Sequence, residues 1–364
     1  MWYKAVLVSC ILVVFSPVQA VELALFGDAS YAFTLDNADP HSFFLGTIDL
    51  NVSQDLSDTT QVTADLLFHG NQNDYKSLVD RVIISRSFTD YFNVSFGRIH
   101  TPIGFWNQNF HHGAYIQDTV SRPVFLDYET SGNAILPTHI VGLQANGQIN
   151  KWGYQFAIAN SNGIDSTINP QDTPPTELEV IDGKDPSKEK TFAMRMTYGP
   201  QQWLQETGIF ALFNNVTELG NFDPNNTNSS SLKNYGDILF NQQVFGFDLR
   251  TNQENWYLFS EFYYIYTEEL ATNTNQTGYN ATAFYIQGGY RQSNKIIYVA
   301  RFEDMNFDPD DNYYKLLGVE PQSRYILALN YRIEDSNGIH IEFNHTDKTQ
   351  AVNKIILQWY FALL

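Results

Sequence analysis

Residues 43–69 read FFLGTIDLNVSQDLSDTTQVTADLLFH, two alternating polar–apolar runs that are separated by a tight turn. Apolar residues occupy every second position in both runs: Ile48, Leu50 and Val52, then Val62, Ala64, Leu66 and Phe68. Such alternation is the main sequence signal of a β-strand with one apolar face. The Leu56-Ser57-Asp58 segment between the runs, with Ser and Asp, is typical of a turn. The stretch therefore predicts an antiparallel hairpin.

Similar runs continue to the end of the chain, and about sixteen can be marked. They cover residues 23–35, 43–54, 60–69, 78–88, 92–98, 139–147, 152–160, 191–198, 207–214, 239–250, 255–267, 281–291, 295–303, 322–332, 338–344 and 351–363. The gap after an odd-numbered run is usually long, and the gap after an even-numbered run is nearly always short; the gap 345–350 is an exception. Transmembrane β-barrels sort their connections in this way, with short periplasmic turns and long outer loops. The sequence predicts an all-β fold, a closed antiparallel transmembrane β-barrel of about sixteen strands over residues 21–364, with both termini at the periplasmic end.

The first twenty residues have the features of a secretory signal peptide. Lys4 precedes an apolar stretch, and Val18-Gln19-Ala20 supplies a small-residue cleavage site. Cleavage after Ala20 would remove Cys10, the single cysteine, so the mature chain could form neither a disulfide nor a thiolate metal site. The apolar stretch is too short to span a membrane comfortably as an anchor.

Composition favours a barrel with an apolar outside and a wet inside. Mean hydropathy is −0.29, yet 15% of the residues are aromatic. The net charge of −19, which becomes −20 once Lys4 is removed, excludes nucleic acid as an expected partner. Four tryptophans lie at or beside the expected periplasmic turns, where an aromatic girdle is predicted: Trp152, Trp203, Trp256 and Trp359.

The connection 99–137 has the most distinctive sequence. It starts within Gly97–Asn107 (GRIHTPIGFWN) and continues through His111-His112-Gly113, Arg122-Pro123 and Leu136–His139 (LPTH). This string, about a tenth of the chain, resembles Gram-negative porin-like outer-membrane proteins akin to the phosphate-selective porins. The resemblance implies a β-barrel in the outer membrane of a Gram-negative bacterium, with a loop folded into the lumen. It also implies passive diffusion of small solutes.

The residues themselves support an inward position for this third outer loop. A loop of nearly forty residues with many aromatic side chains is expected to pack against something, and the lumen wall is nearest. We expect its charged and aromatic residues to narrow the pore and set its field. These are Arg98, His100, Trp106, Asp118, Arg122, Asp127 and Glu129.

Strand parity assigns charges of both signs to the lumen. The expected lumen-facing residues are Asp49, Asp65, Arg195, Glu261, Arg301, Arg324, Arg332 and Glu342. Such a mixed lumen lacks the basic pattern that phosphate selectivity requires, so phosphate specificity is not carried over from the resemblance. Acidic outer loops favour a mild cation preference that fades with ionic strength.

The sequence contains weak candidates for a metal site and for a catalytic site. His100, His111, His112 and His139 lie in or next to the loop, but adjacent histidines in an extended segment point to opposite sides, so no metal site is expected. Asp308–Asn312 lacks the glycine and the distal glutamate of a calcium loop and is expected to be a solvated acidic loop. Ser121 near His111 or His112 is the only suggestive catalytic cluster, and an ordinary loop serine explains it better.

The sequence thus predicts a porin for small polar or ionic solutes rather than an enzyme, with no cofactor. The alternative is a plugged barrel that acts as a surface-binding protein or a membrane enzyme. The expected partners are outer-membrane lipid and small hydrophilic solutes, and a homotrimer is the assembly to be tested.

Overall fold

The structure is a computed structural model that describes residues 21–35, 41–71, 74–110, 114–127, 134–166, 178–199, 204–220, 234–270 and 277–364. The expected signal peptide, residues 1–20, lies outside these ranges. His111, His112, Glu129 and Trp203 also lie outside them. Within the described residues no helix is both long and apolar enough to cross a membrane.

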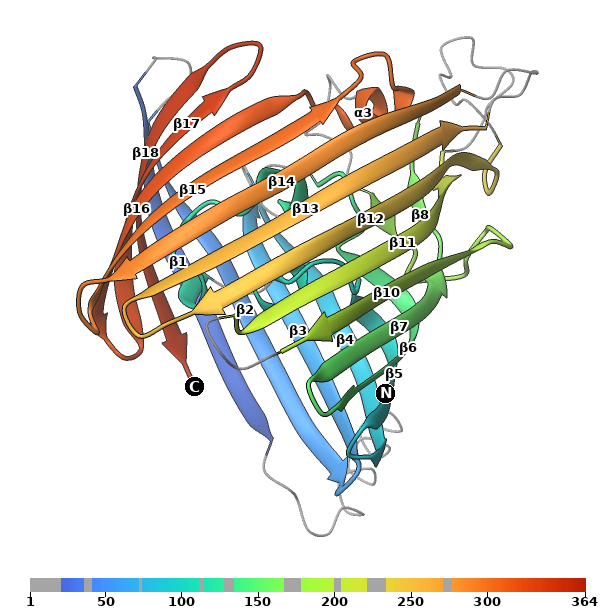
Figure 1. Ribbon diagram of the computed structural model, residues 1–364, viewed down its shortest axis with the longest axis horizontal. Helices are drawn as coiled ribbons and strands as arrows, with labels where there is room; N and C mark the ends of the chain where they lie inside the picture. The colour runs from blue at the N-terminus through green and yellow to red at the C-terminus, as the bar shows by residue number, and fades with distance from the viewer. Residues whose placement is uncertain are drawn as a thin grey trace, which may run out of the picture.

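Sixteen long strands form one closed antiparallel barrel (Figure 1). They are β1 (Glu22–Thr34), β2 (Ser42–Ser57), β3 (Thr60–Asn71), β4 (Asp74–Thr89), β5 (Phe92–His100), β6 (His139–Ile149), β7 (Trp152–Asn160), β10 (Lys190–Tyr198), β11 (Glu206–Glu218), β12 (Ile238–Asn252), β13 (Trp256–Glu269), β14 (Thr277–Arg291), β15 (Ile296–Phe307), β16 (Gln322–Glu334), β17 (Asn337–Asp347) and β18 (Val352–Leu363). Consecutive members pair antiparallel, and β1 pairs with β18 from Leu25↔Leu363 to Thr34↔Lys354. Closure leaves no open strand edge, as a lipid environment requires.

Each of the sixteen predicted runs overlaps one barrel strand, so the fold prediction is confirmed. The periplasmic turns are short, as at residues 58–59, 90–91 and 335–336, whereas the connections 101–138 and 161–189 are long. One outer gap is shorter than expected, because β3 and β4 extend until only residues 72–73 separate them. Longer strands pair more backbone groups before the chain turns.

Several short elements in the long connections were not predicted. Strands β8 (Asn162–Ile164) and β9 (Glu179–Val180) lie between β7 and β10, and β8 pairs in parallel with β11. Helix α3 (Asn312–Leu317) lies between β15 and β16. In the 101–138 loop, α2 (Trp106–Asn109) and the 3-10 turns η1 (Ala114–Ile116) and η2 (Val124–Leu126) give local order. Segments of two to six residues are too short to leave a periodic signal.

The two faces of the barrel wall differ as the alternation predicts. On β18, Trp359 is exposed on the outside while the neighbouring Tyr360 is buried on the inside. Trp152 and Trp256 are also exposed beside short turns, and the Trp152 and Tyr198 rings lie 4.8 Å apart between centroids. These positions agree with an aromatic girdle at the periplasmic boundary.

Candidate functional site: a loop packed inside the barrel

The connection between β5 and β6 spans residues 101–138, and its described parts, residues 101–110, 114–127 and 134–138, enter the ring of strands (Figure 1). Its two ends are joined, because the Thr101 N–H donates to Thr138 O at 2.9 Å. The Asn107 side-chain amide donates to both of these residues' carbonyl oxygens, each at 2.9 Å. We call residues 101–138 the inner loop. Tyr115 within it donates to Asp335 O at 2.7 Å, so the inner loop reaches the periplasmic turn between β16 and β17.

Three wall glutamates hold the backbone of the inner loop. Glu261 on β13 accepts the Trp106 N–H, and Glu303 on β15 accepts the Val124 N–H at 2.8 Å. Glu342 on β17 accepts the N–H groups of Val120 and Ser121 at 2.7 and 3.1 Å, and also the Ser121 hydroxyl. The three glutamates are completely buried. Because each carboxyl group accepts from a different part of the loop backbone, these contacts fix the loop at three points.

Two wall arginines complete this attachment. Arg301 donates to Thr119 Oγ1 at 3.1 Å and to Ser121 O at 2.6 Å. Arg324 donates to Arg122 O and forms an ion pair with Glu303. The lumen-facing charges therefore neutralise one another and bind loop backbone. A buried ion pair of this kind needs such additional hydrogen bonds, because both charges have lost their water.

Apolar packing joins the inner loop to the same side of the wall. Phe125 lies 5.1 Å from Tyr263 of β13, and Phe105 lies 5.4 Å from Phe259, between ring centroids. Burying a side chain of this size contributes about 1.5–3 kcal/mol. The loop side chains buried in this cluster are Ile103, Phe105, Trp106, Val124, Phe125, Leu126, Ile135 and Leu136.

Helix α3 covers the inner loop from the connection between β15 and β16. The Tyr313 hydroxyl donates to Ile135 O at 2.7 Å, and Gln242 of β12 donates to the same oxygen at 3.4 Å. Asp311 caps the helix by accepting the Tyr313 N–H at 2.9 Å. Burial raises the pKa of Asp311 to about 6, although this hydrogen bond acts in the opposite direction. The prediction of a solvated acidic loop is therefore wrong at Asp311, which is buried.

The wall formed by β2–β7 carries mainly small polar side chains on its inner face, and these keep partial contact with solvent. They include Asn51, Ser53, Thr63, Ser85, Asn93, Asn146 and Gln155. Cross-strand pairs such as Ser85 and Ser95, whose hydroxyls lie 2.9 Å apart, place these groups on one face. Most of the hydrogen bonds that fix the inner loop go to β12–β17, opposite this polar wall, and one goes to the polar wall itself, where Gln155 of β7 donates to Gln108 Oε1 at 3.0 Å.

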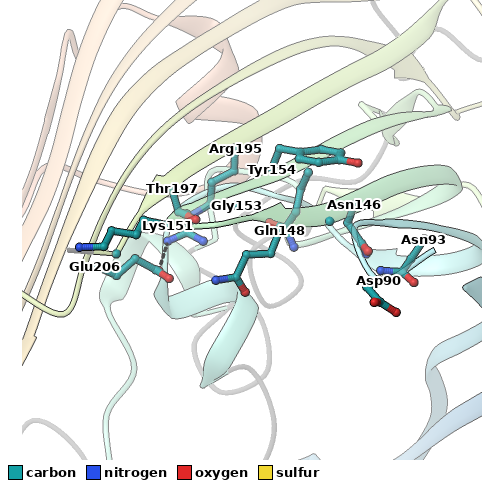
Figure 2. Close-up of a pocket in the computed structure, with 13 residues that line it drawn as sticks. Asp90, Asn93, Asn146, Gln148, Lys151, Gly153, Tyr154, Arg195, Thr197 and Glu206 are labelled. Carbon is teal, nitrogen blue, oxygen red and sulfur yellow. Dashed lines mark hydrogen bonds and ion pairs between the residues drawn. The ribbon is translucent and has the colours of Figure 1, made fainter. Parts of the chain in front are cut away.

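A polar cavity of about 460 Å³ opens beside β5–β7 and β10–β11 (Figure 2). Asn93, Asn146 and Lys151 line it, together with Arg195 and Glu206, which form an ion pair at 2.9 Å. A second cavity of about 650 Å³ lies at the ends of β14, β15 and β16, near the short turns. It is lined by Arg291, Ser293, Asn294, Lys295, Ile297, Arg332, Ile333, Glu334 and Asp335.

The predicted loop residues have different positions. His100, Trp106, Arg122 and Asp127 are buried. Asp118 is half-buried and accepts the side-chain amide of Asn330 at 3.1 Å. Glu129 lies outside the described residues.

Arg98 reaches away from the inner loop. It pairs with Asp182 at 2.7 Å and donates to Asp80 O at 2.8 Å.

The predicted lumen charges mostly take part in internal pairs. Arg195 pairs with Asp248 at 2.7 Å, and Asp65 pairs with Arg81. Asp49, Asp65, Arg195, Glu261, Arg301, Arg324 and Glu342 are all buried. Arg332 is exposed and borders the second cavity.

Glu303, Asp80 and Arg81 were missed by sequence reasoning. Glu303 has the inward parity of Arg301 on its strand, which is a signal that could have identified it.

Comparison with solved structures places this architecture among known proteins. An in-vitro folded OmpT of Vibrio cholerae, described as a trimer form, has a TM-score of 0.60 at 11% identity, over 94% of this chain and 99% of the other. An anion-selective porin from Comamonas acidovorans has a TM-score of 0.63 at 9% identity, over 94% and 99%. The outer-membrane channel DcaP of Acinetobacter baumannii has a TM-score of 0.60 at 10% identity, over 94% and 97%.

The chain has the fold of Gram-negative outer-membrane porins. The Vibrio cholerae and Acinetobacter baumannii proteins are outer-membrane proteins, and this chain shares their fold. No family model matches the sequence, and no curated protein matches it. At identities near 10% the likeness extends to the fold alone.

Proposed function

We propose that the chain is an outer-membrane porin through which small polar or ionic solutes diffuse passively, without a chemical step. The fold that it shares with a porin and an outer-membrane channel supports this function. The apolar outer face fits outer-membrane lipid as the surrounding medium.

One observation carries the proposal, namely that the inner loop is fixed mainly to one side of the barrel. Its hydrogen bonds to Glu261, Glu303 and Glu342 all lead to β13, β15 and β17. The polar inner face of β2–β7 keeps partial contact with solvent, and the 460 Å³ cavity lies at the end of that wall. A solute path would therefore run between the inner loop and this polar wall. Pores of this kind select by diameter and by the charges that line them.

Charged residues with partial solvent contact are proposed to face this path. The Arg81 side chain is 24% exposed and belongs to this group. Arg98 does not, because it is the register partner of Val82 on the outer face and pairs with Asp182. The buried loop residues His100, Trp106, Arg122 and Asp127 are proposed to shape the inner loop rather than touch solute. Asp118, which is half-buried, belongs to the group that narrows the passage.

The contacts of Ser121 oppose an enzymatic function for the inner loop. Its hydroxyl donates to Glu342, and Asn344 donates to the same hydroxyl at 3.1 Å. The same Glu342 carboxylate also accepts the backbone N–H groups of Val120 and Ser121, so its contacts with this serine are those of a loop attachment.

Conductance in planar bilayers tests the proposal. The mature chain, refolded in detergent and checked by heat-modifiable gel mobility, should give stable single-channel steps. Deleting residues 101–119 should increase the step size, because this part of the inner loop occupies the lumen. A correctly folded barrel that never conducts would establish the plugged barrel instead, and unchanged conductance in the deletion variant would place residues 101–119 outside the solute path.

A homotrimer is proposed as the assembly, supported by the trimer form of the similar Vibrio cholerae protein. Light scattering on the detergent-solubilised chain, with the detergent contribution subtracted, should give three chains per particle. A single chain per particle would contradict this assembly.

A further inference from the structure

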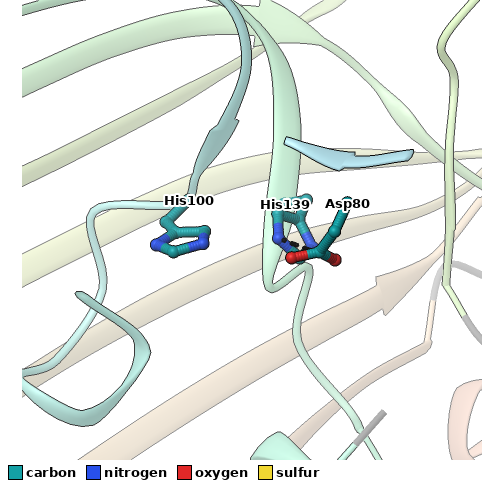
Figure 3. A group of neighbouring side chains, drawn as sticks. All are labelled: Asp80, His100 and His139. Atoms are coloured by element: carbon teal, nitrogen blue, oxygen red, sulfur yellow. Dashed lines mark ion pairs between the residues drawn. The ribbon is translucent and has the colours of Figure 1, made fainter. Parts of the chain in front are cut away.

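Asp80, His100 and His139 meet at the root of the inner loop (Figure 3). They come from three adjacent strands, since Asp80 lies on β4, His100 ends β5 and His139 begins β6. All three side chains are buried. Two imidazoles and one carboxylate form a ligand set that proteins use for zinc and other first-row divalent metals.

A local irregularity of the barrel directs Asp80 toward the two histidines. In the ladder between β3 and β4, Asp65 pairs with Arg81 while Leu66 pairs with Val79, so Asp80 is an additional residue in β4. A β-bulge of this kind redirects a side chain and is common beside functional sites. Arg98 on β5 holds the bulge by donating to the Asp80 carbonyl oxygen at 2.8 Å.

The two histidines are brought together by strand register. His100 and His139 are direct partners in the antiparallel pair of β5 and β6, and their ring centroids lie 5.1 Å apart. Side chains directly opposite each other on neighbouring strands project from the same face. Thr101 and Thr138, the adjoining ends of the inner loop, are hydrogen-bonded to each other at 2.9 Å, which keeps the two strand ends together.

The distances between ligand atoms fit one metal ion. His139 Nε2 lies 3.4 Å from Asp80 Oδ1, and one ligand atom from each of the three residues can be chosen so that all lie within 4.8 Å of one another. Two atoms bound to zinc at about 2.0–2.1 Å in a tetrahedral site lie about 3.3 Å apart. The Asp80–His139 pair already has this separation, and small side-chain rotations bring His100 to the same ion.

We propose that Asp80, His100 and His139 form a divalent-metal site. Zinc is the expected metal, because it prefers the imidazole and carboxylate ligands that these residues supply. Three protein atoms, one from each residue, would bind the ion. It would join β4, β5 and β6 at the point where the inner loop leaves and re-enters the barrel wall. Its role is structural: it fixes the ends of the inner loop. Calcium and magnesium are not the expected ions at this site, because they prefer oxygen donors over imidazole nitrogen.

Zinc titration of the full mature chain without a histidine tag tests the site. The chain is refolded in detergent, treated with a chelator, dialysed and titrated by calorimetry, with bound zinc counted by elemental analysis. One zinc per chain is expected. Asp80→Asn, His100→Gln and His139→Gln should each weaken binding by at least about 10–100-fold, the loss typical even for residues that only orient a metal ligand. His345→Gln is the matched control, since His345 lies elsewhere, on β17, with its ring 2.8 Å from Asn353 Oδ1.

A second measurement separates a metal site from a simple His139–Asp80 ion pair. Zinc should raise the temperature of heat modification for the natural chain and for His345→Gln, and should leave it unchanged for the three site variants. X-ray absorption at the zinc edge should show two imidazole ligands. Absence of zinc binding would overturn the proposal in favour of the ion pair. Zinc that persists in the site variants but is lost in a His111→Gln, His112→Gln double variant would overturn it in favour of another site.

Discussion

Glu303 on β15 accepts a 2.8 Å hydrogen bond from the backbone N–H of Val124, and this contact joins the middle of the inner loop to the barrel wall. Glu303 is also paired with Arg324 and lies 3.7 Å from Arg301. A single buried carboxylate therefore serves both the loop backbone and the two wall arginines. Its loss would leave two cations and one N–H without their shared acceptor.

Replacing Glu303 with alanine should therefore loosen the inner loop. Removing one partner of a buried ion pair costs about 3–5 kcal/mol, because the other charge stays buried. We expect a lower free energy of unfolding in urea and larger, noisier single-channel currents. Glu303→Gln retains a side-chain oxygen that can accept the Val124 N–H and should loosen the loop less. Glu334→Ala, at an exposed position, is the control, and equal effects of Glu303→Ala and Glu334→Ala would contradict the attachment.

Gly104 is a position where the inner loop cannot accept a side chain without displacing its neighbours. Its φ is +62°, and an added Cβ would lie 2.1 Å from Glu261 Oε2 and 2.2 Å from the Tyr263 hydroxyl. The backbone conformation alone costs an alanine about 1–2 kcal/mol. Gly104→Ala should therefore displace Trp106 from Glu261 and change tryptophan fluorescence. Gly183→Ala, where no atom lies within 4 Å of an added Cβ, should leave both stability and fluorescence unchanged. Similar spectra for the two variants would count against this tight contact.

The barrel could be predicted from sequence because its signal is repeated sixteen times. Each strand alternates independently, and lipid on one side with water or protein on the other forces the alternation. The inward position of the inner loop was also predictable, because its aromatic content requires a packing partner. The wall residues that bind the inner loop were not predictable. Glu261, Glu303 and Glu342 are far from the loop in the chain. Strand alternation shows only that a carboxylate faces inward, and it does not show whether that carboxylate binds water or loop backbone.

The Asp80 cluster shows a different limit. Val79 and Val82 are both exposed on the outer face, three positions apart, and Asp80-Arg81 lies between them. This odd step in a period-two pattern is the sequence signature of the bulge, and it could have been recognised. The meeting of Asp80 with His139 could not, because it depends on the register of β4 through β6 around the bulge.

Helix α3 should respond to pH through Asp311. Its pKa in the folded protein is about 6, above the ordinary value of 3.8, because the carboxyl is buried. The folded state therefore binds more protons than the opened state between these two values, so the stability of α3 falls as pH rises through this window. Hydrogen exchange of the α3 amides, corrected for intrinsic rates, should show less protection at pH 6.5 than at pH 4.5. Asp311→Asn keeps a capping side chain and should remove the difference; protection that increases with pH in the natural chain would contradict the mechanism.

Ion selectivity should depend on Arg81 more than on the fully buried charges. Asp49, Asp65 and Glu342 are at most 1% exposed, whereas the Arg81 side chain is 24% exposed beside the polar wall. The acidic outer loops should give a mild cation preference at low salt, which fades when the screening length falls below about 8 Å. An ion that passes about 8 Å from Arg81 in water feels about 0.5 kcal/mol. Arg81→Gln should therefore raise the cation-to-anion permeability ratio roughly two- to fivefold, as measured from reversal potentials in a KCl gradient.

Arg86→Gln is the matched control, because Arg86 lies over the Phe88 ring at 5.6 Å and is exposed on the outer face of the same strand. A strong anion preference that persists at high salt in the natural chain would show instead that the arginines of the inner wall control the passage.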